Sequence, residues 1–490
     1  METYEKLADP VALTIFLLTL SLPILIGFLT LRRTRSQSDF LIGGRAMDKI
    51  VVALSAVSSG RSSWLVLGVS GMAYTRGTGA VWAVTGYILA ELFQFIYIGR
   101  PLRRESERYG SLTLLDYFES RFRDNLQVIR ITGVVIIALF LTAYVAAQFN
   151  AGAKALATAL NIHLLLALAF SGVLILVYMV MGGYIAVAYN DVVRAVIMII
   201  GLVVFPVYGL VQIGGVDALL AILSRLNPSY IDPLSLGFGA LIGFLGIGLG
   251  SPGQPHIVVR YMSVNDPAKL RSAAVIGTFW NVVLGWGAVF IGLLGRAAVP
   301  TVGNLPEQDP EMIFLVLSSD YFGPILYGLL IGGIFAAILS TVDSQLLVVA
   351  STFVRDLHEK VLFKKHEFSE EQKLRLNRIV VILAGLAALV SAYLAQELVF
   401  WLVLYAWAGL GAAFGPALIT SLYWRRTSRA GIVAGMITGA VTIIIWKRYL
   451  SGPTGIYELL IGFPAALLAI VVGSLLSSRQ TTSKYTGRQS

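Results

Sequence analysis

Ser340 and Thr341 are adjacent hydroxyl-bearing residues inside a long apolar run, 322–353. Sodium is a hard cation that prefers oxygen ligands, and hydroxyls together with freed backbone carbonyls supply them at little net charge. An unwound segment near residues 58–61 would provide those carbonyls. The pair is therefore a candidate sodium site. The alternative is that both hydroxyls bond back to their own helix, as serine and threonine often do.

Five ionisable residues also lie within apolar runs: Arg61, Glu91, Asp191, Arg194 and Asp343. A charge at the centre of a membrane helix costs at least about 2.5–3.5 kcal/mol on insertion scales, so it normally faces a partner or a cavity. Asp191 and Arg194 are three residues apart, which allows a local ion pair. Glu91 shares a polar stripe with Gln94, and both a packing role and a proton-linked role remain open for it.

The composition defines the environment in which these residues act. Of the 490 residues, 57% are hydrophobic and 13% are charged, and the mean hydropathy is +0.79. These values exclude a water-soluble globular enzyme and a disordered chain, and they predict a multi-pass protein of the lipid bilayer. The chain has no cysteine and its four histidines are scattered, so no zinc site or nucleophile–base arrangement is expected.

The apolar runs predict an all-α chain with about thirteen transmembrane helices. Their approximate limits are 10–31, 48–75, 79–99, 127–157, 164–183, 190–212, 236–258, 268–298, 322–353, 375–396, 399–422, 429–447 and 456–477. Lysine and arginine collect in the loops after spans one, three, seven, nine and eleven. This alternation predicts an N-terminus outside and a C-terminus in the cytoplasm. It also accounts for the net charge of +10 without a nucleic-acid partner, and no obligate protein partner is evident.

Two of the spans are interrupted by small or helix-breaking residues. Span two contains Ser-Ser-Gly-Arg-Ser-Ser at 58–63, and span seven contains a Gly- and Pro-rich stretch at 246–255. Unwound backbone at membrane depth is tolerated where it faces protein or a watery cavity. The breaks are five spans apart, which is the pattern of an inverted five-plus-five repeat with a substrate site at the breaks. The alternative is a pair of kinked, tightly packed helices.

Six collinear motifs carry a resemblance to the sodium:solute symporter family, and within it to the sodium/proline symporter branch. They are FLIGGR (40–45), LSAVSSGRSSWLVLG (54–68), GGYIAVAYNDVVRA (182–195), GQPHIVVRYM (253–262), AAILSTVDSQLLV (336–348) and YAWAGLGAAFGPAL (405–418). The resemblance implies a LeuT-type inverted repeat in one transmembrane domain, 1–490. A preceding helix would lie in 10–40, the repeats in 46–212 and 236–424, and trailing helices in 428–478.

The resemblance also implies roles for individual residues. The implied sodium ligands are Ala337, Ser340 and Thr341, completed by backbone near Ser58 and Arg61, with Asp191 and Arg45 linked to coupling. The implied pocket positions are Tyr144, Gln254 and Pro255, and the breaks add Ser59, Gly60, Arg61, Ile247 and Ser251.

The chain departs from the branch at four of these positions. Proline symporters typically carry an aspartate where Gly60 stands and an apolar residue where Arg61 stands. They also carry a tryptophan and a tyrosine where this chain has Ile247 and Ser251. Two interpretations of Arg61 follow. It pairs with Asp191 or Asp343, or it binds an anionic group of the substrate.

These features predict a sodium-coupled symporter of the plasma membrane that imports a small zwitterion or carboxylate, with proline or a related amino acid first among the candidates. Alternatives are a different small carboxylate or a sugar, coupling to protons, and a sensor that binds solute without transporting it. Sodium is the expected coupling ion, and no enzymatic activity is expected.

Overall fold

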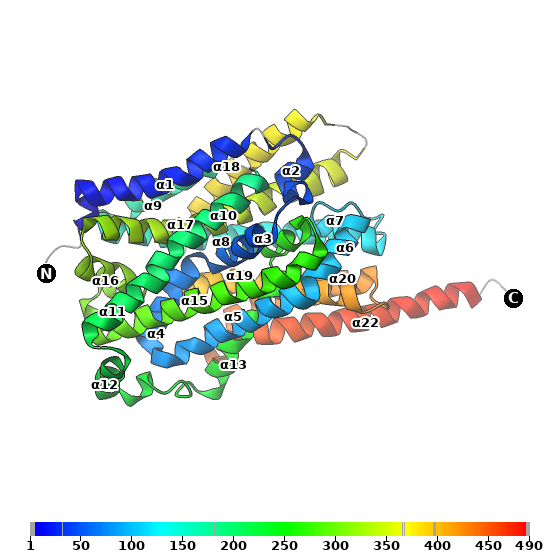
Figure 1. The fold of residues 1–490 in the computed structure, drawn as a ribbon. Coiled ribbons are helices and arrows are strands. Elements are labelled where there is room, and N and C mark those ends of the chain that lie inside the picture. Colours follow the sequence, from blue (N-terminus) through cyan, green and yellow to red (C-terminus); the bar gives the residue numbers. More distant parts are fainter. Residues whose placement is uncertain are drawn as a thin grey trace.

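The computed structural model describes residues 5–486 except 32, 180–182, 365, 367 and 395–397, and all regular elements in these ranges are helices. A helix satisfies its backbone hydrogen bonds internally, as the hydrocarbon core of a membrane requires. The long helices lie side by side, with α1 and α18 along one edge of the bundle and α22 at another (Figure 1).

The described residues up to Leu226 form twelve α-helices. They are α1 (Pro10–Leu31), α2 (Gln37–Ile42), α3 (Lys49–Ser63), α4 (Ser70–Arg76), α5 (Val81–Phe93), α6 (Arg100–Arg108), α7 (Leu114–Phe122), α8 (Val128–Leu160), α9 (Leu164–Met179), α10 (Tyr184–Ile199), α11 (Phe205–Ile213) and α12 (Val216–Leu226). Short 3-10 or π-helical segments connect several of them without a loop.

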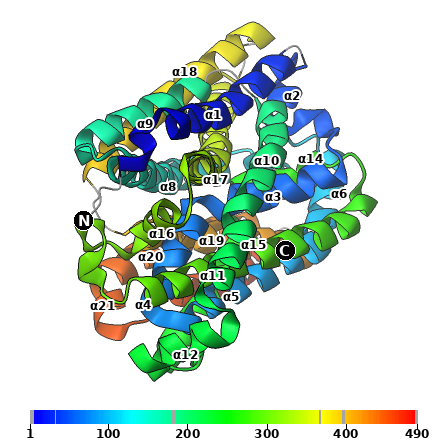
Figure 2. The ribbon, with the colours of Figure 1, turned by 60° about the vertical axis from the view of Figure 1, so that its left-hand side comes forward.

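The described residues from Phe238 onward form ten more. They are α13 (Phe238–Gly246), α14 (Pro255–Ser263), α15 (Leu270–Ala298), α16 (Ile313–Tyr321), α17 (Pro324–Ser351), α18 (Glu370–Leu394), α19 (Val399–Tyr423), α20 (Arg429–Ile445), α21 (Ser451–Thr454) and α22 (Leu459–Thr486). α17 lies at the centre of the bundle, where it packs against α1, α3, α8 and α10 (Figure 2).

Among the described residues, ten helical stretches are long and apolar enough to cross a membrane. One of them, Lys49–Arg108, contains both the second and the third predicted spans, and two shorter apolar helices cover Leu164–Leu174 and Phe238–Gly253. The chain is therefore a multi-pass helical membrane protein, and the count of thirteen remains a prediction.

Both predicted interruptions are present. In the first, Ser62 has φ 49° and ψ −173°, and a π-helical segment, Trp64–Val69, separates α3 from α4. In the second, a 3-10 segment, Ile247–Gly253, separates α13 from α14. The first interruption is narrower than the sequence predicts, because residues 58–61 remain in α3.

Candidate functional site

The hydroxyls of Ser340 and Thr341 meet the carbonyls at the end of α3. Ser340 Oγ donates to Ser58 O at 3.1 Å and to Ala337 O at 2.9 Å. Thr341 Oγ1 donates to Ser59 O at 3.0 Å and lies 3.4 Å from Ala337 O. All of these residues are fully buried. The result is a neutral cluster of two hydroxyl and three carbonyl oxygens between α17 and α3.

The break in α3 makes two of those carbonyls available. In a continuous helix, the carbonyls of residues 58 and 59 would accept from the amides of residues 62 and 63. Ser62 has left the helical conformation, and the Ser63 amide donates instead to Gln148 Oε1 at 3.1 Å. The Arg61 carbonyl, a predicted sodium ligand, accepts from the Trp64 amide in this structure.

The oxygen cluster fits a small hard cation of low charge. Hydroxyl and carbonyl oxygens without a carboxylate suit sodium better than a divalent ion. In the described residues, no group of three or more histidine, aspartate or glutamate side chains is arranged to hold a metal. A sodium ion at this position would bind α17 and the broken helix at once, so occupancy and the arrangement of the two helices are linked.

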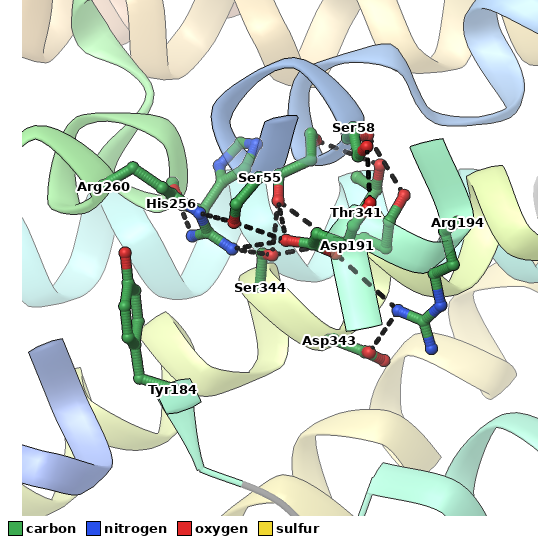
Figure 3. A network of polar contacts seen from close by, with 12 residues as sticks. Ser55, Ser58, Tyr184, Asp191, Arg194, His256, Arg260, Thr341, Asp343 and Ser344 are labelled. Carbon is green, nitrogen blue, oxygen red and sulfur yellow. Dashed lines mark hydrogen bonds and ion pairs between the residues drawn. The ribbon is translucent and has the colours of Figure 1, made fainter. Parts of the chain in front are cut away.

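Asp191 of α10 forms a second polar network beside this cluster (Figure 3). Its Oδ2 accepts from Ser55 Oγ at 2.6 Å and from Ser59 Oγ at 3.0 Å, and Arg260 Nη2 of α14 lies 3.4 Å away. Ser59 Oγ also contacts the Ser340 carbonyl at 3.4 Å. Asp191 is therefore one hydroxyl away from the oxygen cluster, and its charge acts on that cluster through a low-dielectric interior.

The predicted local pair between Asp191 and Arg194 is present but is not the shortest contact of Arg194. Arg194 Nη1 lies 3.8 Å from Asp191 Oδ1 and 2.6 Å from Asp343 Oδ2 on α17. Figure 3 shows Arg194 between the two carboxylates. Asp343 thus has a structural counter-ion and does not face the oxygen cluster as a free charge.

The partner predicted for Arg61 is wrong. Arg61 pairs with neither Asp191 nor Asp343; its Nη2 lies 3.0 Å from Glu91 Oε2 on α5, and its Nε donates to Asn281 Oδ1 at 2.8 Å on α15. The guanidinium carbon also lies 3.6 Å from the centre of the Tyr87 ring. The sequence does not identify Glu91 as the partner of Arg61, because no spacing along the chain shows that a residue of α3 meets a residue of α5.

These contacts lead to a double-mutant prediction. Removing one member of a buried ion pair typically costs about 3–5 kcal/mol, because the other charge is left unpaired. We expect Arg61→Met and Glu91→Gln each to lower the midpoint of thermal unfolding in detergent clearly, and the double variant to recover most of the loss. The double variant should also keep its substrate affinity. Loss of binding in the double variant at normal stability would mean that Arg61 contacts the substrate.

The second break brings several predicted pocket residues together. The Tyr144 ring on α8 meets the His256 ring edge-on, with centroids 5.9 Å apart. Gln254 Nε2 donates to Trp407 O at 2.9 Å, and Trp407 Nε1 donates to Ile247 O at 2.8 Å. α8 and α19 therefore contact the second break, and both also contact the first, through Gln148 with Ser63 and through Phe400 with Trp64.

Aromatic residues that sequence reasoning missed surround the same region. The centre of the Tyr87 ring lies 5.3 Å from the centre of the Trp407 ring and 6.3 Å from that of the Trp64 ring. A Cβ on Gly60 would lie 2.1 Å from the Tyr87 hydroxyl, so an aspartate at this position would need Tyr87 to move. Tyr87 thus occupies space that the missing side chain at residue 60 leaves open.

A large cavity leads toward the second break from one face of the bundle. It has a volume of about 790 Å³, and its lining includes Arg76, Tyr230, Ile247, Trp401 and Glu458. Its lining comes from α4 and α13, from the segment between α12 and α13, and from the segment around α21. On the opposite side, the void beside Pro255, Arg260 and Ser344 measures only about 30 Å³. The structure is therefore more open toward the first face.

Arg45 lies apart from both clusters. Its Nη1 donates to Met262 O at 2.9 Å, and its Nη2 donates to Ser106 O at 3.0 Å and to Ser111 O at 2.7 Å. Burial, reinforced by the nearby Arg103, lowers the pKa of Arg45 to about 10. These contacts join α6 to the end of α14, so an effect of Arg45 on coupling would have to act through helix position.

An oxygen cluster at one broken helix, together with a second broken helix in the same all-α membrane bundle, is typical of secondary transporters. Comparisons with known proteins give the family. The model of the sodium:solute symporter family matches residues 40–439, and the chain belongs to this family. Members carry solutes and are not enzymes, and sodium is their coupling ion.

Individual relatives cover nearly the whole chain. The sodium/proline symporter of Escherichia coli K12 is 36% identical over 458 residues, which is 92% of this chain and 90% of the relative. The osmoregulated proline transporter OpuE of Bacillus subtilis is 32% identical over 465 residues, 94% of each chain. A Na+-coupled sialic acid symporter solved in an outward-open state has a TM-score of 0.81 at 18% identity, covering 95% of this chain and 97% of that one. This likeness confirms the LeuT-type fold.

Proposed function

We propose that this symporter uses the inward movement of sodium to import proline or a closely related amino acid across the plasma membrane, with its N-terminus outside and its C-terminus in the cytoplasm. Relatives named as proline transporters are 32–36% identical over more than nine-tenths of the chain. The observation that carries the proposal is the oxygen cluster formed by Ser340, Thr341 and the end of α3.

The proposed mechanism follows from where this cluster lies. Sodium would bind the carbonyls of Ser58 and Ser59 together with the two α17 hydroxyls, and so hold the broken helix against α17. Solute would enter through the 790 Å³ cavity and bind between the two breaks. The break residues proposed to line this pocket, Ser59, Gly60, Ile247, Ser251 and Pro255, are all buried. Release to the other side requires the small void beside Arg260 to open.

Several features bear on the alternatives. Arg61 is already paired with Glu91 and hydrogen-bonded to Asn281, so a simple carboxylate would have to compete with Glu91 for this cation. Tyr87, Trp64 and Trp407 supply aromatic surface near the position where Ile247 and Ser251 replace aromatic residues. A ring the size of proline can pack against such a surface. The aromatic surface therefore fits a solute with a small ring, such as proline.

Uptake of radiolabelled proline into proteoliposomes tests the proposal. With an inward sodium gradient, we expect saturable uptake that excess unlabelled proline abolishes and that sugars and dicarboxylates leave unchanged. Sodium-driven uptake of a different solute, with no competition by proline, would contradict the substrate assignment. Saturable proline binding without any uptake would identify a sensor instead.

A further inference from the structure

Gln148 has an amide orientation that its neighbours fix. Its Oε1 accepts from the Ser63 backbone amide at 3.1 Å and from Ser63 Oγ at 2.9 Å. A backbone N–H can only donate, so the oxygen of Gln148 must face Ser63 and its NH2 group must point away. Gln148 is fully buried, and its Nε2 has no hydrogen-bond partner.

Gln254 has the opposite orientation for the same reason. Its Nε2 donates to Gly250 O at 3.1 Å and to Trp407 O at 2.9 Å. Carbonyl oxygens can only accept, so the NH2 group of Gln254 faces them. Its Oε1 is buried and has no partner. One glutamine therefore presents an unused donor, and the other presents an unused acceptor.

Both groups belong to the region between the breaks. Gln148 lies one helical turn after Tyr144 on α8 and contacts the first break through Ser63. Gln254 ends the second break, two residues before His256, whose ring contacts Tyr144. Buried polar groups are nearly always paired, because leaving one unpaired costs free energy. A bound solute would supply the missing partners.

We propose that Gln148 and Gln254 together recognise a zwitterionic substrate. The amide NH2 of Gln148 donates to the substrate carboxylate, and the amide oxygen of Gln254 accepts from the substrate's ammonium group. The inference rests on the proposed function and narrows it to α-amino acids, including those with a secondary ammonium. Solutes that lack either group would leave one glutamine unpaired. Gln148 is thus a specificity-determining residue that the pattern of motifs does not mark.

A ligand–mutant cycle tests the role of Gln148. Gln148→Glu keeps an oxygen toward Ser63 but replaces the donor with a carboxylate oxygen. We expect the Kd of proline to rise at least about tenfold, while the Kd of pyrrolidine, which lacks the carboxylate, rises less than about threefold. A matched control is Gln94→Glu, since Gln94 is an equally buried glutamine that contacts Tyr261. This variant should leave the proline-to-pyrrolidine ratio unchanged.

The ammonium half of the proposal is tested on the unmodified protein and on Gln254→Met. Tetrahydro-2-furoate has the ring and the carboxylate of proline but an ether oxygen in place of the ammonium. We expect it to bind the unmodified protein at least tenfold more weakly than proline, and we expect Gln254→Met to abolish this preference. Equal losses for proline and pyrrolidine in Gln148→Glu, or equal binding of furoate and proline, would overturn the inference.

The same binding measurements separate this inference from the proposed function. If the unmodified protein binds another amino acid in place of proline, the proline assignment fails, and the cycle is run with that amino acid and its matched analogues. If it binds only sugars or dicarboxylates, both proposals fail. If it binds proline but the cycle shows no coupling to Gln148, only the inference fails.

Discussion

Alanine at both Ser340 and Thr341 is expected to raise the sodium concentration that gives half-maximal proline uptake by about 30-fold or more. The double change removes two of the five oxygens in the cluster, and a lost buried ligand oxygen costs about 1 kcal/mol or more. The initial rate of uptake into proteoliposomes, measured against external sodium, gives the value directly. Maximal uptake at saturating sodium should fall much less.

Two further variants control this experiment. Ser351 is also on α17 and also donates to its own helix, to Val348 O at 2.8 Å, but it lies far from the break. Ser351→Ala should leave the sodium dependence unchanged. Thr341→Ser keeps the hydroxyl and should restore most of the affinity. An unchanged half-saturation in the double alanine variant would show that sodium binds elsewhere.

Asp191→Asn is expected to weaken sodium binding by about tenfold or more, with a loss of stability as well. A carboxylate one hydroxyl away from the cluster, roughly 7 Å, attracts a monovalent cation by about 2 kcal/mol at an effective dielectric constant of 20. Removing the charge also leaves Arg260 without its buried counter-ion. The measurement is the sodium dependence of proline binding, together with the unfolding midpoint.

A second substitution separates the two effects. Arg260→Gln in the Asp191→Asn background removes the unpaired cation, so both stability and sodium affinity should recover in part. Asp217→Asn, at an exposed position on α12, serves as the surface control. A sodium dependence that Asp191→Asn leaves intact would mean that Asp191 only positions α10 against α3.

The oxygen cluster could be predicted from the sequence because the residues that form it stand out locally. The hydroxyls at 340–341 stand within an apolar run, and small residues form a run at 58–63. Each feature can be recognised without information from the rest of the chain. They meet at 3.0–3.1 Å because α17 packs against α3. The expected carbonyls are also available to the cluster. They are freed by the backbone conformation of Ser62 and not by unwinding of residues 58–61.

The partners of the buried charges could not be predicted in the same way. Arg61 meets Glu91 and Asn281 because α3, α5 and α15 pack together, and no spacing in the chain encodes that packing. Gln148 could not be predicted either, because a single glutamine in an apolar helix belongs to no recognisable motif. Its importance depends on which atoms face Ser63, which only coordinates can show. The helical stretch Lys49–Arg108 contains two predicted spans, and Gly77, with φ 61°, lies at the boundary between them.

The most direct test of the account is movement of sodium driven by proline alone. Proteoliposomes would contain the same total sodium concentration inside and outside, with ²²Na⁺ tracer only outside, no membrane potential and an inward proline gradient. The account predicts transient accumulation of ²²Na⁺ inside, above the level of tracer exchange, and its absence in the Ser340→Ala/Thr341→Ala variant at the same sodium concentration. Proline entry without any net sodium movement would contradict sodium coupling through this site.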